Sequence, residues 1–71
     1  MIEFQLKENS EYIELIKLLK VLNLVGSGAE AKKAVEEGRV KLNGEIENRK
    51  RAKVRDDSVV EFDNQKIKVL K

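Results

Sequence analysis

The chain has 71 residues, of which 41% are hydrophobic and 39% charged, enough apolar material for one small core under a densely charged surface. It contains no Cys and no His, which excludes disulfides, a structural zinc site and any nucleophilic catalysis that needs an imidazole or a thiolate. No apolar run approaches the length of a signal peptide or a membrane span, so we expect a cytoplasmic protein forming a single domain over residues 1–71.

The first third of the chain predicts one strand followed by one helix. Apolar and polar residues alternate over residues 2–6, the period of a strand with one buried face. Asn9 and Ser10 can then cap a helix whose first turn holds Glu11 and Glu14, near the positive end of the helix dipole. The apolar residues that recur at helical spacing and should be buried are Tyr12, Leu15, Ile16, Leu19 and Leu22.

A second helix is predicted from a local signal at each of its ends. Ser27 and Glu30 have the spacing of a capping box, in which both side chains satisfy free backbone donors at a helix start. Gly38 suits the left-handed residue that ends a helix. The pattern predicts that Ala31, Ala34 and Val35 are buried and that Lys32, Lys33, Glu36 and Glu37 are exposed.

A hairpin is predicted around Asn43-Gly44, a dipeptide typical of two-residue turns. Val40 and Leu42 alternate with cations before the turn and should face the core. A strict two-residue loop would leave Ile46 on the opposite face. We therefore expect a bulge or a longer loop that brings Ile46 level with Leu42.

The remaining sequence predicts further strands. Residues 51–55 alternate, with Ala52 and Val54 facing inward and three cations facing outward. Strands at 58–62 and 67–70 follow turns at Asp56-Asp57 and Asp63-Asn64. The order of elements predicts an α+β fold with two packed helices on a small, mainly antiparallel sheet.

Positive charge is concentrated in the middle of the chain although the net charge is only +2. Residues 1–38 carry five Lys or Arg against seven Asp or Glu, and residues 56–71 carry three against four. Residues 39–55 carry seven against two, a net of +5. Such a segment is typical of a phosphate-binding face. The alternative is a solvated loop, or one neutralised by the nearby Asp56 and Asp57.

The sequence gives little support for a catalytic site, a cofactor site or a site that stacks unpaired bases. Neighbouring carboxylates such as Glu36 and Glu37 point in different directions on a helix, so they cannot act as a catalytic pair. The single glycines form no phosphate-binding loop, and no cofactor or metal is implied. Phe4, Tyr12 and Phe62 are expected to face the core. A basic surface without exposed aromatic rings suits the phosphates and 2′-hydroxyls of folded RNA better than unpaired bases.

The sequence also resembles a known family. The segments Ser27-Gly28-Ala29-Glu30-Ala31-Lys32 and Gly38-Arg39-Val40-Lys41-Leu42-Asn43-Gly44, with Val35 between them and Val59-Val60 after an acidic turn, carry the resemblance. They are similar to the RNA-binding domain named after small-subunit ribosomal protein S-four, the alpha-L motif. A narrower resemblance, to the small stand-alone bacterial proteins of the YbcJ type, is carried by the short terminal strands and by Ser27-Gly28, Ala31-Lys32 and Asn48-Arg49-Lys50-Arg51.

The resemblance implies that structured RNA, often ribosomal RNA or transfer RNA, binds across the second helix and the following loop. The sequence departs from the family pattern at two places: Gly28 stands where many relatives have Arg, and Asp56-Asp57 where many have Gly-Asp. The first departure weakens the usual phosphate contact at the helix start, so binding is expected to depend on Lys32 and residues 49–55. The motif and the basic segment together give the candidate RNA-binding residues Ser27, Lys32, Lys33, Arg39, Lys41, Asn43, Arg49, Lys50, Arg51, Lys53 and Arg55.

The hypothesis is a non-enzymatic module that binds structured RNA, in ribosome assembly or function. One alternative is a protein-interaction module whose basic segment docks an acidic partner. Another is an accessory domain of an RNA-modifying enzyme, although we expect no catalytic domain to accompany this chain.

Overall fold

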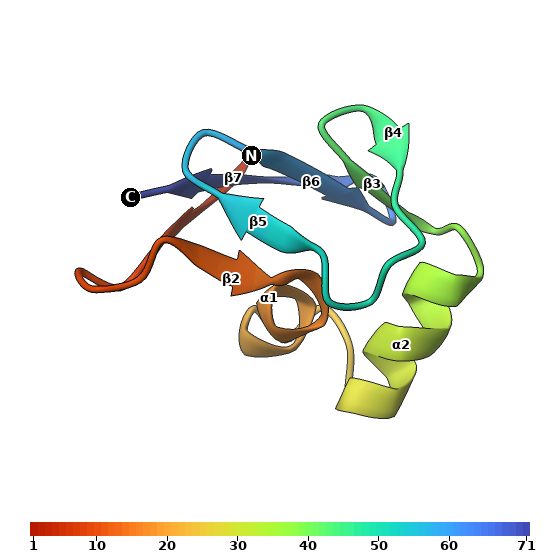
Figure 1. Cartoon of the computed structure of the whole chain (residues 1–71). Coiled ribbons are helices and arrows are strands. Elements are labelled where there is room, and N and C mark those ends of the chain that lie inside the picture. Colours follow the sequence, from red (N-terminus) through yellow and green to blue (C-terminus); the bar gives the residue numbers. More distant parts are fainter.

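The computed structural model describes residues 1–71, with the strands gathered on one side of the molecule and both helices on the other (Figure 1). Neither helix is long and apolar enough to cross a membrane. The elements in chain order are β1 (Ile2–Gln5), β2 (Tyr12–Glu14), α1 (Leu15–Val21), α2 (Gly28–Glu36), β3 (Val40–Leu42), β4 (Glu45–Ile46), β5 (Lys53–Arg55), β6 (Val59–Phe62) and β7 (Gln65–Leu70).

Seven strands form two sheets. The larger has the order β1-β7-β6-β3-β4, in which β1 runs parallel to β7 and the other neighbours are antiparallel. The smaller is an antiparallel ribbon of β2 and β5. The predicted α+β architecture, two helices packed on a mainly antiparallel sheet, is confirmed, and the parallel β1–β7 pair makes the larger sheet mixed.

The core between the sheets and the helices consists of fifteen buried residues, all of them hydrophobic. Ala31 and Ala34 on α2 are almost completely buried, and their small side chains let α1 and α2 approach closely, as the sequence predicts. The largest side chains that are fully buried are Leu15, Leu18, Leu19 and Ile67. The chain has no Cys and therefore no disulfide, so the burial of these side chains is the main source of the stability of the fold.

The first helix begins later than predicted. Residues 12–14 form β2 instead of the first helical turn, with Tyr12 opposite Arg55 and Ile13 opposite Val54. The physical reason is a long-range pairing that overrides the local helical pattern, because β2 gains a backbone ladder with a segment some forty residues away. Tyr and Ile are also favoured in strands.

Loop carbonyls take the place of the expected side-chain cap on α1. The N–H of Leu15 donates to the Ala52 carbonyl at 2.9 Å, and the N–H of Ile16 donates to the Lys50 carbonyl at 3.3 Å. The residue at the N-cap position, Glu14, makes no side-chain cap. The helix start and the loop before β5 therefore satisfy each other's backbone groups, which fixes the basic segment against the core.

The second helix agrees with its prediction. The Ser27 hydroxyl oxygen accepts a hydrogen bond from the Glu30 N–H at 3.2 Å, and the Glu30 carboxylate accepts one from the Gly26 N–H at 2.5 Å. The capping carboxylate thus reaches one residue further back than in the usual box. At the other end, Gly38 has φ +75°, the left-handed conformation expected of it.

Replacing Ser27 by Ala should lower the free energy of unfolding by about 0.5 to 2 kcal/mol, because one backbone donor of α2 loses its acceptor. Chemical denaturation of the variant measures this loss. The control is Ser27→Asp, whose side chain keeps an acceptor at the same position and should retain the stability. Equal stability of the Ser27→Ala variant and the wild type would rule out the hydroxyl as a stabilising cap.

The predicted bulge in the hairpin is wrong. Lys41 pairs with Ile46 and Leu42 with Glu45, which is the register of a strict two-residue loop. Asn43 and Gly44 both have positive φ, 52° and 88°, as a type I′ turn requires. The preference of Asn-Gly for a two-residue turn decides the register here, although burial of Ile46 would favour a bulge. As a result, Ile46 is exposed on the outer face of the sheet.

Candidate nucleic-acid interface

The outward cations of the basic segment lie where the sequence places them. Arg51, Lys53 and Arg55, called the basic row below, are all exposed, whereas Ala52 and Val54 between them are 5% and 0% exposed. Lys53 and Arg55 belong to β5, so their positions are about 6.6 Å apart, two strand rises. Arg51 lies in the turn just before this strand, so the row extends from that turn along β5.

The nearby aspartates do not neutralise this row. The Asp57 carboxylate pairs with the Lys68 ammonium at 2.6 Å, and this hydrogen bond lowers the pKa of Asp57 below its usual value. Asp56 accepts a hydrogen bond from the backbone N–H of Lys71 at 2.9 Å. Lys71 also donates a hydrogen bond to Glu11 and so lowers the pKa of the Glu11 carboxyl. Arg55 attracts the same carboxylate more weakly. No member of the row forms an ion pair within 4.0 Å.

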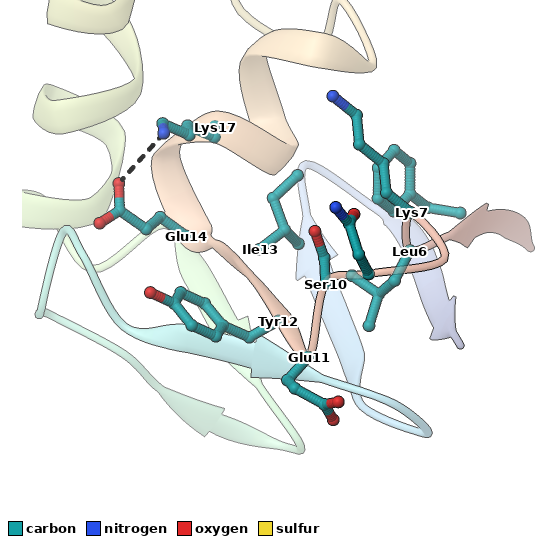
Figure 2. Close-up of a pocket in the computed structure, with 10 residues that line it drawn as sticks. Leu6, Lys7, Ser10, Glu11, Tyr12, Ile13, Glu14 and Lys17 are labelled. Carbon is teal, nitrogen blue, oxygen red and sulfur yellow. Dashed lines mark ion pairs between the residues drawn. The ribbon is translucent and has the colours of Figure 1, made fainter.

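Tyr12 lies beside the basic row and is not buried as the sequence suggested. Because residues 12–14 form a strand instead of a helix, the Tyr12 side chain faces solvent and retains 39% of its exposure. The Lys53 ammonium is 5.0 Å and the Arg55 guanidinium carbon 5.8 Å from the centre of its ring. Figure 2 shows Tyr12 and Ile13 on opposite sides of β2, with the tyrosine ring over β5. An aromatic ring therefore interleaves the cations, a feature that the helical pattern concealed.

Arg49 is compensated by a neighbouring carboxylate. Its guanidinium donates to both Glu47 oxygens, at 3.0 and 3.2 Å, and its backbone N–H also donates to Glu47 at 3.1 Å. These bonds hold the pKa of Glu47 below its usual range and raise that of Arg49. The guanidinium remains largely exposed, so it presents charge to solvent from a fixed position.

The loop before β5 is tied to α2. The Lys50 ammonium donates to the Glu36 carboxylate at 3.1 Å, across from the last turn of the helix. Lys32 lies one turn before Glu36, and Lys33 is next to it; both are exposed and have no ion pair. The Lys50–Glu36 pair thus ties the loop before the basic row to α2, the helix that also carries Lys32 and Lys33.

The other candidates, Arg39, Lys41 and Asn43, are paired with residues on β6 or in the turns of the larger sheet. Arg39 pairs with Asp63 at 2.9 Å and with Glu37 at 3.5 Å, and the hydrogen bond that it donates to Asp63 is the largest cause of its raised pKa. Lys41 is opposite Glu61 on the outer face of the larger sheet. Asn43 accepts a hydrogen bond from the Val59 N–H at 2.8 Å and so fastens the hairpin to β6.

An open groove of about 550 Å³ lies beside Tyr12, between the segment after β1 and the start of α1 (Figure 2). Its apolar lining residues are Phe4, Leu6, Tyr12 and Ile13. Charges at its rim are mixed, with Glu14 and Lys17 paired at 3.9 Å. No group of three carboxylates in the structure is arranged to hold a metal ion. The groove therefore does not extend the cationic surface.

Comparison with known proteins identifies the family. The sequence profile described as "S4 domain" matches residues 4–70, nearly the whole chain. The chain belongs to the S4 domain family. The resemblance carried by the Ser27 and Gly38 segments is thereby confirmed.

Two curated relatives and one solved structure extend this comparison. The domain is 41% identical over 59 residues to the "Putative RNA-binding protein YbcJ" of Escherichia coli strain K12, with 83% of this chain and 84% of that protein covered. It is equally similar to the uncharacterized protein YbcJ of Shigella flexneri. The solution structure of E. coli YbcJ, described as revealing an alfaL motif involved in RNA-binding, has a TM-score of 0.76 at 38% identity, covering 100% of this chain and 89% of that one. The S4 domain therefore has the alpha-L fold.

Proposed function

We propose that this S4 domain binds structured RNA in the cytoplasm without catalysing a reaction, and that the RNA is ribosomal RNA or transfer RNA met during ribosome assembly or function. The observation that carries the proposal is the basic row Arg51, Lys53 and Arg55, exposed and free of ion pairs. Phosphate binding gains most from cations that are not already neutralised, because each one can release counterions from the RNA. The family match and the description of YbcJ as an RNA-binding protein support it.

The binding surface in this proposal runs from β5 across the loop before it to α2. Lys32 and Lys33 extend the positive charge of the row along the helix, and the Lys50–Glu36 pair fixes the loop between them. The buried Ala52 and Val54 anchor the row, so little flexibility is lost on binding. The backbone that carries the cations is packed against the core, so binding to phosphates requires movement of the side chains only. We propose secondary roles only for Ser27, Arg39, Lys41, Asn43 and Arg49.

The second candidate, an acidic protein partner on the same cations, makes a different experimental prediction. Crosslinking of the protein in cells, followed by sequencing of the attached RNA, should recover ribosomal RNA or transfer RNA. Retention on ribosomal particles should fall with salt and disappear after ribonuclease treatment. Retention that survives ribonuclease, with no RNA recovered, would instead establish the protein partner.

A further inference from the structure

Tyr12 stands out among the three aromatic residues. Phe62 is 4% exposed, and Phe4 is half-buried against the core, whereas the Tyr12 side chain projects from the ribbon of β2 and β5 into solvent. The next residue of β2, Ile13, is the one that packs against the core. Core packing therefore accounts for Ile13 and does not account for an aromatic ring at position 12.

The surroundings of the ring have the composition of a nucleotide site. Lys53 and Arg55 flank it from the neighbouring strand, with their cationic groups 5.0 and 5.8 Å from the ring centre. Neither cation is held by a carboxylate, and contacts between exposed cations and rings are weak. Both long side chains can leave the ring for a phosphate at little cost. Tyr12 also belongs to the lining of the open groove that begins beside β2.

We propose that Tyr12 is a stacking platform for one unpaired base of the bound RNA, while Lys53 and Arg55 hold the adjoining phosphates. The inference rests on the proposed RNA binding and specifies which part of the RNA is bound. A base within a helix keeps both faces covered by its neighbours, so only a base in a loop, bulge or end offers a free face to the ring. The domain then prefers folded RNA that carries an unpaired nucleotide over a continuous duplex.

Tyrosine fluorescence tests the stacking directly. Tyr12 is the sole tyrosine and the chain has no Trp, so its emission reports this one ring. Two RNAs are compared, a stem with a single bulged nucleotide and the same stem without it. Stacking should quench the emission with the bulged stem and leave it nearly unchanged with the continuous one.

Substitutions give a second readout on the same two RNAs. Tyr12→Leu should weaken binding to the bulged stem by about tenfold, within the range for losing one base–aromatic stack, and leave affinity for the continuous stem unchanged. Tyr12→Phe keeps the ring and should bind like the wild type. The free energy of unfolding of each variant is also measured, so that a loss of binding caused by misfolding is recognised. The fluorescence experiment uses the wild-type protein and does not depend on any substitution.

The outcomes separate this inference from the proposed function. Equal quenching by both RNAs, or equal loss of affinity for both in Tyr12→Leu, would overturn the stacking site while leaving RNA binding by the basic row intact. Failure of the wild type to bind either RNA, or any RNA recovered from cells, would overturn the proposed function and the stacking site with it.

Discussion

Replacing Arg51, Lys53 and Arg55 together by Gln should lower the affinity for folded RNA by at least about tenfold, since about three phosphate contacts are lost. The log–log dependence of affinity on salt should become less steep by about 2 to 3 for the same reason. All three side chains are exposed and make no ion pair, so the variant should fold normally. Filter binding or fluorescence anisotropy at several salt concentrations measures both quantities.

The matched control removes Lys66 and Lys68, which are also two positions apart on one strand, β7, and lie outside the proposed surface. Lys68 pairs with Asp57 on the surface, an interaction whose loss costs little stability. Removing positive charges lowers the RNA affinity of any basic protein, whether or not the charges lie in a binding site. The comparison is therefore made per charge removed, and equal losses in the two variants would mean that the binding site is not localised at the basic row.

Leu15→Ala should have the largest effect on stability, about 2 to 5 kcal/mol of the free energy of unfolding. Leu15 is completely buried at the junction of β2 and α1, and its N–H bonds the loop that carries the basic row. A domain of this size has a total free energy of unfolding of only about 5 to 10 kcal/mol. The substitution should therefore remove a large share of it and leave a marginally stable protein. Chemical or thermal denaturation measures the loss.

The control for this substitution is Val21→Ala on the same helix, where the side chain is 57% exposed. Its effect should stay below about 1 kcal/mol, because little apolar surface is returned to water. A loss at Leu15 no greater than the loss at Val21 would mean that the junction of β2 and α1 is not part of the cooperative core.

The parts of the fold that were predicted correctly depend on short-range chemistry. The Ser27–Glu30 cap and Gly38 define both ends of α2 within a dozen residues, and the alternation around Ala52 and Val54 follows directly from strand geometry. These signals need no knowledge of the rest of the chain. Both the helix and the orientation of the basic row were therefore predictable.

The errors arise where a distant segment decides the structure. Whether residues 12–14 form a helix or a strand depends on β5 and on the loop carbonyls that bond α1, and neither is visible locally. The hairpin register follows from positive φ at Asn43 and from its bond to Val59, which outweigh burial of Ile46. Each of these choices is a tertiary effect that overrides a local pattern.

The same limit applies to the candidate site. The distribution of charge identified the basic segment, but the partners that engage Arg39 and Lys50 come from the fold, because they lie 24 and 14 residues away in the chain. The exposure of Tyr12 follows from the misassigned strand. The β-forming pair Tyr12-Ile13 before a leucine-rich helix was the one sequence signal that could have indicated it.

The salt dependence of RNA affinity tests the central claim most directly. Five cations near the proposed surface have no ion pair, namely Lys32, Lys33 and the basic row, and each phosphate contact contributes about −0.7 to −0.9 to the log–log slope. Titrating the wild-type protein against a folded RNA between about 50 and 200 mM salt should give a slope of about −3.5 to −4.5. An affinity that stays flat over this range would contradict binding through an electrostatic surface.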